Sequence, residues 1–355
     1  MNKSLIATTA IILAAQGAAA QEVTLRMGDS LPVGHVIAET ATQPWIDLVT
    51  EKLGGKLKIE YFPAQQLGKA PEFLKLTQAG LVDIGYIGPA YVSEKMPLSA
   101  VAELPGASKT SCEVMRSYWA LVKEGGWLYE NEYAPNGIRP LFVVALPPYQ
   151  LILANDDVTS AESLKGKKIR AAGGAQSLTL EELDMVPVRM APPEIYDAMS
   201  RGTVDGALLA HISVDSYKLT PITKAVSKGQ NFGTVVVAYS INQRKWASLP
   251  EEMKAALNEA GDEIAEIACE GFDEKETAAA DALEKAGVSF VLMDDADTEI
   301  LQSVNTKIAR EWAETLDERG LPGSEALEQF NAALAKTRQM LDTSECERTQ
   351  TAGEC

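Results

Sequence analysis

Histidine is scarce in this chain of 355 residues, which contains only His35 and His211. Two histidines leave little room for His-dependent acid–base catalysis, and no Cys/His pattern has the spacing of a zinc site. The sequence also lacks a Gly-x-Ser-x-Gly nucleophile elbow, a Gly-x-Gly-x-x-Gly loop after a strand and a metal-ligand helix. We therefore expect no catalytic residues, no bound metal and no cofactor.

Basic residues are outnumbered, with 32 Lys and Arg against 50 Asp and Glu and a formal net charge of −18. A deficit of this size argues against a nucleic-acid partner, because phosphate binding needs clustered basic side chains. The net charge does not identify a small ligand, since a pocket can have the opposite sign to the surface around it.

Long hydrophobic runs are missing except at the N-terminus. Lys3 precedes a mostly apolar stretch over residues 5–15, and small residues follow at 17–20. This pattern predicts a signal peptide of residues 1–20 that is cleaved near Ala20, and hence export to the periplasm. No other segment approaches the roughly 18 apolar residues of a membrane-spanning helix. No cysteine lies near the cleavage point, so we expect no lipid anchor.

The four cysteines fall into two pairs, for which the sequence suggests different chemical states, a possible disulfide and two free thiols. Cys346 and Cys355 flank a short polar tail, residues 342–355, and the spacing leaves open whether they form a disulfide in an oxidising compartment. Cys112 and Cys269 fall within helical patterns, which predicts buried thiols.

The order of elements predicts an α/β fold. Residues 23–27 and 56–61 read as strands, and residues 35–53 between them have helical spacing that stops at Gly54. A capping box from Ser248 to Glu251 predicts a helix that continues to residue 286. Such a helix either kinks at an internal glycine or crosses the whole protein. Two further helices are expected over residues 298–316 and 324–341.

An internal repeat suggests two related units with a cleft between them, where small molecules commonly bind. In both copies a proline opens a short helix that a glycine ends before a strand. The matching positions are Pro71, Glu72, Gly80, Val82 and Asp83 in one copy and Pro193, Glu194, Gly202, Val204 and Asp205 in the other. We expect Asp83 and Asp205 to cap local turns.

Arg170 is the strongest candidate for a binding residue. A capping box at Thr159 and Glu162 precedes a strand over residues 167–172, which runs into Gly173 and Gly174. Ligands of open α/β sheets collect outside the carboxyl ends of strands, and Arg170 lies near such an end. A guanidinium there can hold a carboxylate through two parallel hydrogen bonds. The alternative is a surface arginine paired with a nearby acid.

Several segments together resemble the substrate-binding proteins of TRAP transporters, of the DctP type. They are residues 61–68 (YFPAQQLG), 80–83 (GLVD), 104–105 (LP), 164–170 (LKGKKIR), 187–190 (PVRM), 194–198 (EIYDA), 202–206 (GTVDG) and 246–251 (WASLPE). The resemblance implies a two-lobe, periplasmic-binding-protein-like α/β fold with crossing strands and a long lobe-spanning helix. It implies capture of a small organic anion, a carboxylate clamp at Arg170 and delivery to the membrane subunits of a TRAP permease.

The predicted lobe I comprises residues 21–147 and 235–277, and lobe II comprises residues 148–234 and 278–341. Three departures from the family pattern predict a less cationic and more apolar pocket. Gln150, beside Tyr149, replaces a second arginine, Leu209 replaces an asparagine, and Pro192 replaces an aromatic residue. These departures favour a monocarboxylate with an apolar or aromatic body.

The remaining predicted ligand contacts lie at strand ends or on a crossing strand. They are Ser30, Tyr86, Gly88, Gly173, His211 and Tyr239. Two other classes of protein stay open, namely the ligand-binding sensor subunit of a signalling receptor and a secreted two-lobe α/β enzyme.

Overall fold

The structure is a computed structural model that describes residues 23–351 except 157, 159, 161 and 292–294, with backbone alone for 344–351. The predicted signal peptide and the sulfur atoms of the open Cys346–Cys355 pairing lie outside what it describes. Thr159, the first residue of one predicted capping box, also lies outside it.

The first lobe is built on a five-stranded sheet with the order β2-β1-β3-β10-β4. β1, β2 and β3 run parallel, and β10 is antiparallel to β3 and β4. The strands are β1 (Val23–Gly28), β2 (Leu57–Phe62), β3 (Ile84–Ile87), β4 (Ile138–Ala145) and β10 (Val236–Asn242). The helices and short helical turns around them are η1 (Ala38–Thr42), α1 (Gln43–Leu53), η2 (Ala70–Glu72), α2 (Phe73–Ala79), η3 (Pro89–Tyr91), η4 (Leu98–Glu103), α3 (Ser111–Val122), η5 (Tyr129–Tyr133) and α7 (Gln243–Ala247).

The second lobe is built on a six-stranded sheet with the order β11-β9-β5-β8-β6-β7. β6, β7 and β8 run parallel, and β5 is antiparallel to β8 and β9. The strands are β5 (Gln150–Leu153), β6 (Lys168–Ala171), β7 (Val186–Arg189), β8 (Gly206–Leu209), β9 (Ala225–Ser227) and β11 (Ser289–Val291). The helices and turns of this part are η6 (Glu162–Leu164), α4 (Gly174–Glu182), η7 (Pro192–Glu194), α5 (Ile195–Ser200), α6 (Ile212–Ser216) and η8 (Thr220–Ile222).

Two segments cross between the sheets and form the hinge region. The chain passes from β4 into β5 and later returns from β9 into β10. The crossings pair with each other, because the backbone N–H of Leu146 donates to Val235 O at 3.3 Å and that of Tyr149 donates to Gly233 O at 2.8 Å. The predicted crossing strands are therefore present. The exact lobe boundaries given above stay a prediction.

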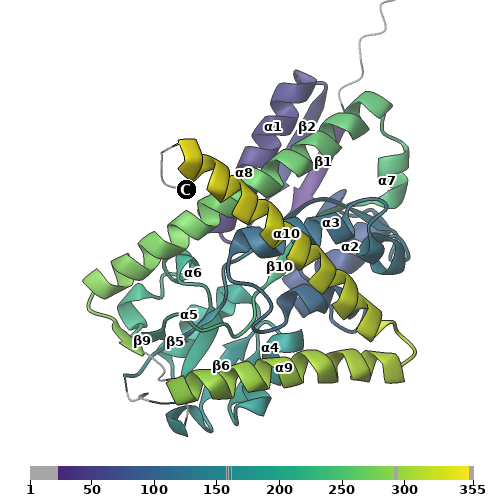
Figure 1. The fold of residues 1–355 in the computed structure, drawn as a ribbon. Coiled ribbons are helices and arrows are strands. Elements are labelled where there is room, and N and C mark those ends of the chain that lie inside the picture. The colour runs from purple at the N-terminus through teal and green to yellow at the C-terminus, as the bar shows by residue number, and fades with distance from the viewer. Residues whose placement is uncertain (1–22, 157, 159, 161, 292–294, 352–355) are drawn as a thin grey trace, which may run out of the picture.

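The long helix α8 (Glu251–Lys285) is one continuous element of 35 residues. At 1.5 Å per residue it extends about 52 Å, and Figure 1 shows it running the length of the molecule. It packs on α1, α3 and β4 at one end and on α6 of the second lobe further along. Gly261 allows this packing, since a Cβ there would collide with the carbonyl oxygen of Leu141 on β4. The predicted lobe-spanning helix is confirmed.

The predicted N-cap of α8, Ser248, is wrong by two residues. Pro250 is its N-cap, and Ser248 ends α7 instead. The hydroxyl of Ser248 donates to Lys245 O at 2.7 Å, so it is already used within the preceding helix.

The two copies of the repeat occupy equivalent places in the two sheets. α2 leads through Gly80 to β3, and α5 leads through Gly202 to β8. Each of these strands lies between a parallel neighbour and an antiparallel crossing strand. The prediction that Asp83 and Asp205 cap local turns is wrong, because each carboxylate accepts a hydrogen bond from a backbone N–H group of a neighbouring strand. Their donors are the N–H groups of Arg26 and Lys168, at 2.8 and 2.7 Å.

Cys112 and Cys269 form a disulfide, with Cα atoms 4.6 Å apart, so the prediction of two buried thiols is wrong. The helical patterns were correct, since Cys112 is the second residue of α3 and Cys269 lies within α8. Packing of α3 on α8 brings together two cysteines that are 157 positions apart, and spacing along the chain cannot reveal such a contact.

Two C-terminal helices complete the fold. α9 (Asp295–Glu318) packs on α4, and α10 (Gly323–Thr351) packs on α9, α3 and η4, crossing α8 in Figure 1. Both predicted helices are present and longer than expected, and α10 continues through most of the segment expected as a polar tail. Over the described residues, none of the helices combines the length and the apolar character needed to span a membrane.

Replacing both Cys112 and Cys269 with alanine should lower the free energy of unfolding by about 2–5 kcal/mol, the usual cost of losing a disulfide that closes a long loop. Urea unfolding of the oxidised protein, the reduced protein and the double variant measures the effect. The double variant should match the reduced protein. An unfolding midpoint equal to that of the oxidised protein would contradict a stabilising role for this disulfide.

Candidate ligand-binding site

Arg170 lies inside the protein, with 1% of its surface exposed. It sits near the carboxyl end of β6, the strand between β7 and β8 in the sheet. Its Nε and Nη2 donate to Met190 O at 3.2 and 3.1 Å, and its Nη1 is 3.4 Å from Leu208 O. Main-chain carbonyl groups that follow or belong to the neighbouring strands therefore fix the plane of the guanidinium.

No carboxylate of the described residues forms an ion pair with Arg170. The alternative of a surface arginine paired with an acid is thus wrong. A buried cation normally has an anionic partner, because removing a charge from water is costly. The Arg170 guanidinium is therefore oriented by carbonyl groups and has no anionic partner among the described residues.

Three tyrosines, Tyr91, Tyr149 and Tyr217, interact with this guanidinium, and Tyr86 lies beside Tyr91. Tyr86 lies on β3, Tyr91 in η3, Tyr149 just before β5, and Tyr217 just after α6. Burial raises the pKa of all four hydroxyls, and the positive charge of Arg170 opposes that rise at Tyr91, Tyr149 and Tyr217. The four hydroxyls are protonated at neutral pH and can donate hydrogen bonds, and their rings offer apolar faces.

An aromatic stack in the first lobe supports Tyr86. The ring of Tyr86 meets that of Tyr239 edge to face at 5.8 Å, Tyr239 stacks on Phe142 at 4.5 Å, and Phe142 stacks on Trp45 at 4.6 Å. Tyr239, a predicted ligand contact, is wholly buried within this stack. Its hydroxyl donates to Asp29 Oδ2 at 2.7 Å.

Asp29 organises the end of β1. Its Oδ2 also accepts from the Tyr61 hydroxyl at 2.9 Å, and its Oδ1 accepts from the N–H of Leu31 at 2.8 Å. Burial raises the pKa of this carboxyl group, and the hydrogen bonds oppose the rise. These contacts are used within the first lobe, so Asp29 serves to position tyrosines.

The two lobes touch near Arg170. The N–H of Val36 in the first lobe donates to Ser216 Oγ in the second at 3.1 Å. Gly173 has a φ of +131°, and a Cβ there would lie 2.7 Å from the carbonyl oxygen of Ala90. Only glycine fits this contact. Gly88 is similarly confined, since a Cβ would lie 2.8 Å from the ring of Tyr91. Both glycines therefore sit where another part of the protein approaches closely. The predicted contact of Gly173 with a ligand stays a prediction.

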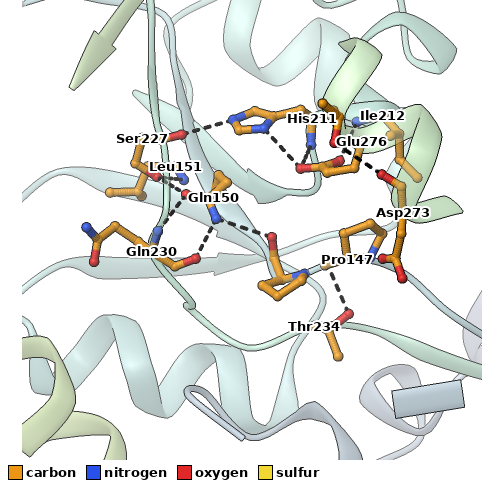
Figure 2. Close-up of polar contacts among 12 residues, drawn as sticks. Pro147, Gln150, Leu151, His211, Ile212, Ser227, Gln230, Thr234, Asp273 and Glu276 are labelled. Atoms are coloured by element: carbon orange, nitrogen blue, oxygen red, sulfur yellow. Dashed lines mark hydrogen bonds and ion pairs between the residues drawn. The ribbon is translucent and has the colours of Figure 1, made fainter. Parts of the chain in front are cut away.

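Gln150 and His211, two other predicted contacts, belong to a separate polar network that Figure 2 shows. Gln150 Oε1 accepts from Ser227 Oγ at 2.9 Å, and its amide nitrogen donates to Gln230 O at 2.5 Å. Leu209 pairs with Gln150 across β5 and β8. Because successive side chains of a strand point to opposite faces, Gln150 is directed away from its neighbour Tyr149.

His211 bridges the crossing segments and α8. One ring nitrogen, Nε2, contacts Ser227 O at 2.9 Å, and the other lies 3.0 Å from Glu276 Oε1. Glu276 also accepts from the N–H groups of His211 and Ile212 at the start of α6. One helical turn earlier, Asp273 accepts from Ser111 N at 2.7 Å and Cys112 N at 3.2 Å at the start of α3.

The His211 network lines a groove of about 520 Å³ beside α8 and the crossing segments. Its position at the hinge and its saturated hydrogen bonds give His211 and Gln150 a structural role in this conformation. Among the described residues no cluster of three or more His, Cys, Asp or Glu is arranged to hold a metal ion.

Glu103, at the end of η4, was missed in the sequence. It is 1% exposed, its Oε1 accepts from Val236 N at 3.3 Å, and its Oε2 has no partner among the described residues. Burial raises the pKa of this carboxyl group to about 8. Its charge also raises the pKa of Tyr91 and Tyr149, which places it near the tyrosine cluster.

The structure thus brings together Arg170, Tyr149, Tyr86, Gly88 and Gly173 from the predicted set, and places Tyr239 one layer behind them. Tyr217 was missed because it follows a helix of only five residues that no pattern marked. His35 was noticed only as the start of a helical pattern, although its ring lies 4.9 Å from that of Tyr217. Ser30 follows β1 in the first lobe, beside Asp29.

Two α/β lobes joined by crossing strands, with a guanidinium enclosed where they meet, define a two-lobe solute-binding protein. The chain belongs to the bacterial extracellular solute-binding proteins, family 7 (DctP), whose family model matches residues 27–315. Members of this family are extracytoplasmic receptors, and the predicted resemblance to the binding proteins of TRAP transporters is confirmed.

Relatives match over most of the chain. An outer membrane transporter protein, TsaT, from Comamonas testosteroni is 24% identical over 337 residues, or 94% of this chain and 98% of the relative. The C4-dicarboxylate-binding periplasmic protein DctP of Rhodobacter capsulatus is 25% identical over 301 residues, or 82% and 85%.

Solved structures show the same fold. A TRAP solute-binding protein from a marine metagenome, specific for aromatic acid ligands, has a TM-score of 0.82 at 23% identity and covers 89% of this chain and 99% of its own. One from Rhodoferax ferrireducens with copurified benzoate has a TM-score of 0.81 at 23% identity, with coverage of 90% and 99%. One from Bordetella bronchiseptica with bound mandelate has a TM-score of 0.79 at 24% identity, with coverage of 88% and 99%.

Replacing Glu103 with glutamine should stabilise the protein more at pH 8.5 than at pH 5. The folded-state pKa of about 8 lies above the ordinary value of 4.5, so the folded protein keeps a proton that the unfolded chain releases. Stability is therefore lost as the pH rises from about 4.5 to about 8 in the wild type, and the neutral amide removes this loss. Urea unfolding at pH 5 and pH 8.5 measures the change in unfolding free energy caused by the substitution. An equal change at both pH values would contradict the burial of a protonated carboxyl group.

Proposed function

We propose that this protein captures a monocarboxylate with an apolar or aromatic body and delivers it to the membrane subunits of a TRAP permease. The observation that carries the proposal is the buried Arg170 guanidinium, which lacks a carboxylate partner among the described residues and is surrounded by tyrosines. The ligand carboxylate would supply the missing negative charge.

The geometry of Arg170 supports a carboxylate in particular. Hydrogen bonds to Met190 O and Leu208 O fix the guanidinium, so little side-chain entropy is lost when an anion binds. A planar, preoriented guanidinium matches the two oxygens of a carboxylate through parallel hydrogen bonds. Lysine cannot reproduce this geometry, because its ammonium group is a point charge on a flexible stem.

The surroundings support one carboxylate and an apolar body. Gln150 stands where relatives are expected to have a second arginine. Its side-chain amide is hydrogen-bonded to Ser227 and Gln230. The rings of Tyr91, Tyr149 and Tyr217 provide flat apolar surfaces near Arg170. A second ionised carboxylate would be desolvated in this environment, which is unfavourable without a second cation.

The solved neighbours give independent support for this class of ligand. Three structures of the same fold contain, or are described as specific for, aromatic acids, namely hydroxyphenylacetate, benzoate and mandelate. Their identity to this chain is 23–24%, so they support the class of ligand through a shared architecture and not through a shared set of contacts.

Capture and release would follow from movement about the crossing segments. The first lobe supplies Tyr86 and Tyr91, the second supplies Arg170 and Tyr217, and a ligand that touches both sets favours the closed arrangement. The permease would then recognise the closed protein and accept the ligand as the lobes separate. The protein performs no chemical conversion in this proposal, and its signal peptide directs it to the periplasm.

Arg170→Ala and Arg170→Lys should both weaken binding of benzoate, or of the best acid in a panel, by 100-fold or more. Leaving a buried carboxylate without its guanidinium costs on the order of 3 kcal/mol or more. Isothermal titration calorimetry measures the effect, with Arg201→Lys as control because that arginine is exposed on the same lobe. Unchanged affinity in Arg170→Lys would show that the clamp lies elsewhere.

Monocarboxylates should raise the melting temperature of the protein, and dicarboxylates of similar size should not. A ligand that binds only the folded state stabilises it by an amount that grows with the ratio of ligand concentration to dissociation constant. A thermal-shift panel of benzoate, phenylacetate, mandelate, succinate and phthalate tests this at one concentration. A shift produced by dicarboxylates alone would reject the monocarboxylate proposal while leaving the family assignment intact.

A further inference from the structure

The loop that leaves β1 contains two buried polar groups that the binding site described above does not use. Ser30 follows Asp29 at the carboxyl end of β1, and His35 precedes the first helical segment. Both side chains are 0% exposed. Neither Ser30 Oγ nor His35 Nε2 has a hydrogen-bond partner among the described residues.

The protonation of His35 follows from its contacts. Its Nδ1 accepts from the backbone N–H of Ile37 at 3.1 Å, so this nitrogen carries no proton. Burial lowers the pKa of the ring to about 3, which keeps it neutral at physiological pH. The single ring proton is therefore on Nε2, and His35 offers one N–H donor that the described protein leaves unpaired.

An unpaired buried donor destabilises a folded protein, and native structures contain few of them. Ser30 and His35 place two such groups on one short loop. A buried polar group of this kind calls for a partner outside the protein chain, such as a water molecule, an ion or a ligand. A ligand can complete these hydrogen bonds only if the loop lies near the Arg170 site.

Contacts of the loop place it close to the Arg170 cluster. The His35 ring lies 4.9 Å from that of Tyr217, and the N–H of the next residue, Val36, bonds to Ser216 beside Tyr217. The charge of Arg170 lowers the pKa of Tyr217 against the effect of burial, and Tyr91 and Tyr149 also act on it. Tyr217 thus connects His35 to the clamp across the junction of the two lobes.

Ser30 approaches the same cluster from the other side. Asp29, its neighbour, binds the hydroxyl of Tyr239, whose ring meets that of Tyr86. The charge of Asp29 also raises the pKa of both Tyr86 and Tyr217. The loop from Asp29 to Val36 therefore borders the site on the first lobe, while Arg170 belongs to the second lobe.

We propose that Ser30 and His35 form a second polar subsite, which binds a hydroxyl or carbonyl oxygen on the body of the ligand. The Nε2–H of His35 donates to that oxygen, and a ligand hydroxyl can donate in turn to Ser30 Oγ. The subsite is neutral and would not offset the charge of a second carboxylate. This inference rests on the proposed function and narrows the ligand to a hydroxy- or oxo-substituted monocarboxylate.

The experiment compares benzoate with 2-, 3- and 4-hydroxybenzoate by isothermal titration calorimetry. The wild-type protein should bind its preferred hydroxybenzoate at least 10-fold more tightly than benzoate, because a site built to bond a hydroxyl leaves polar groups unpaired when the hydroxyl is absent. Ser30→Ala and His35→Phe should each reduce this ratio to within 3-fold of unity. Their affinity for benzoate itself should change by less than 3-fold.

Ser200→Ala is the matched control, because Ser200 is an exposed serine of the second lobe. If His35→Phe does not fold, the hydroxybenzoate-to-benzoate affinity ratio of Ser30→Ala tests the subsite by itself. A wild-type protein with no preference for any hydroxybenzoate, or a preference that survives both variants, would overturn the subsite and leave the Arg170 clamp standing. Failure of every acid to bind the wild type would instead overturn the proposed function, and the subsite with it.

Discussion

The fold is organised around a charge that its own described residues do not neutralise. Burying a guanidinium is unfavourable unless something else offsets the loss of water. Here the carbonyl groups of Met190 and Leu208 offset part of it, and an incoming anion would offset the rest. The uncompensated charge of Arg170 lowers the stability of the protein without a ligand. A bound anion would offset that cost, so the same charge would strengthen ligand binding.

Tyrosine is well suited to surround such a charge. Each ring gives apolar surface with few rotatable bonds, and each hydroxyl can bond to an oxygen of the ligand. The stack of Trp45, Phe142 and Tyr239 holds Tyr86 rigid in the first lobe. Arg170 is held just as firmly in the second lobe. In the proposed function, adaptation to a ligand would come from movement of the lobes and not from rearrangement of these side chains.

Much of this could be predicted from the sequence, and the failures have a common cause. The sequence pattern predicted β1, β2 and α8 to within a few residues. It also predicted that Arg170 lies near the end of a strand, and the proposed clamp starts from that position. Adjacency in the sequence was a poorer guide to which residues lie together. Tyr149 and Gln150 are adjacent, yet strand geometry sends them to different environments. Cys112 meets Cys269, and Tyr217 meets His35, only after distant segments pack together. Such contacts have no local signature.

The attachment points of α8 have a mechanical consequence. Cys269 is bonded covalently to α3, and Glu276, two turns later, holds the start of α6. These anchors are about 10 Å apart along the helix axis. If the lobes separate as proposed, the stretch of α8 between these anchors would have to bend or the Glu276 hydrogen bonds would have to break. Because the N-terminal part of α8 packs on α1, α3 and β4, it would stay with the first lobe, and the helix would change direction near Glu276.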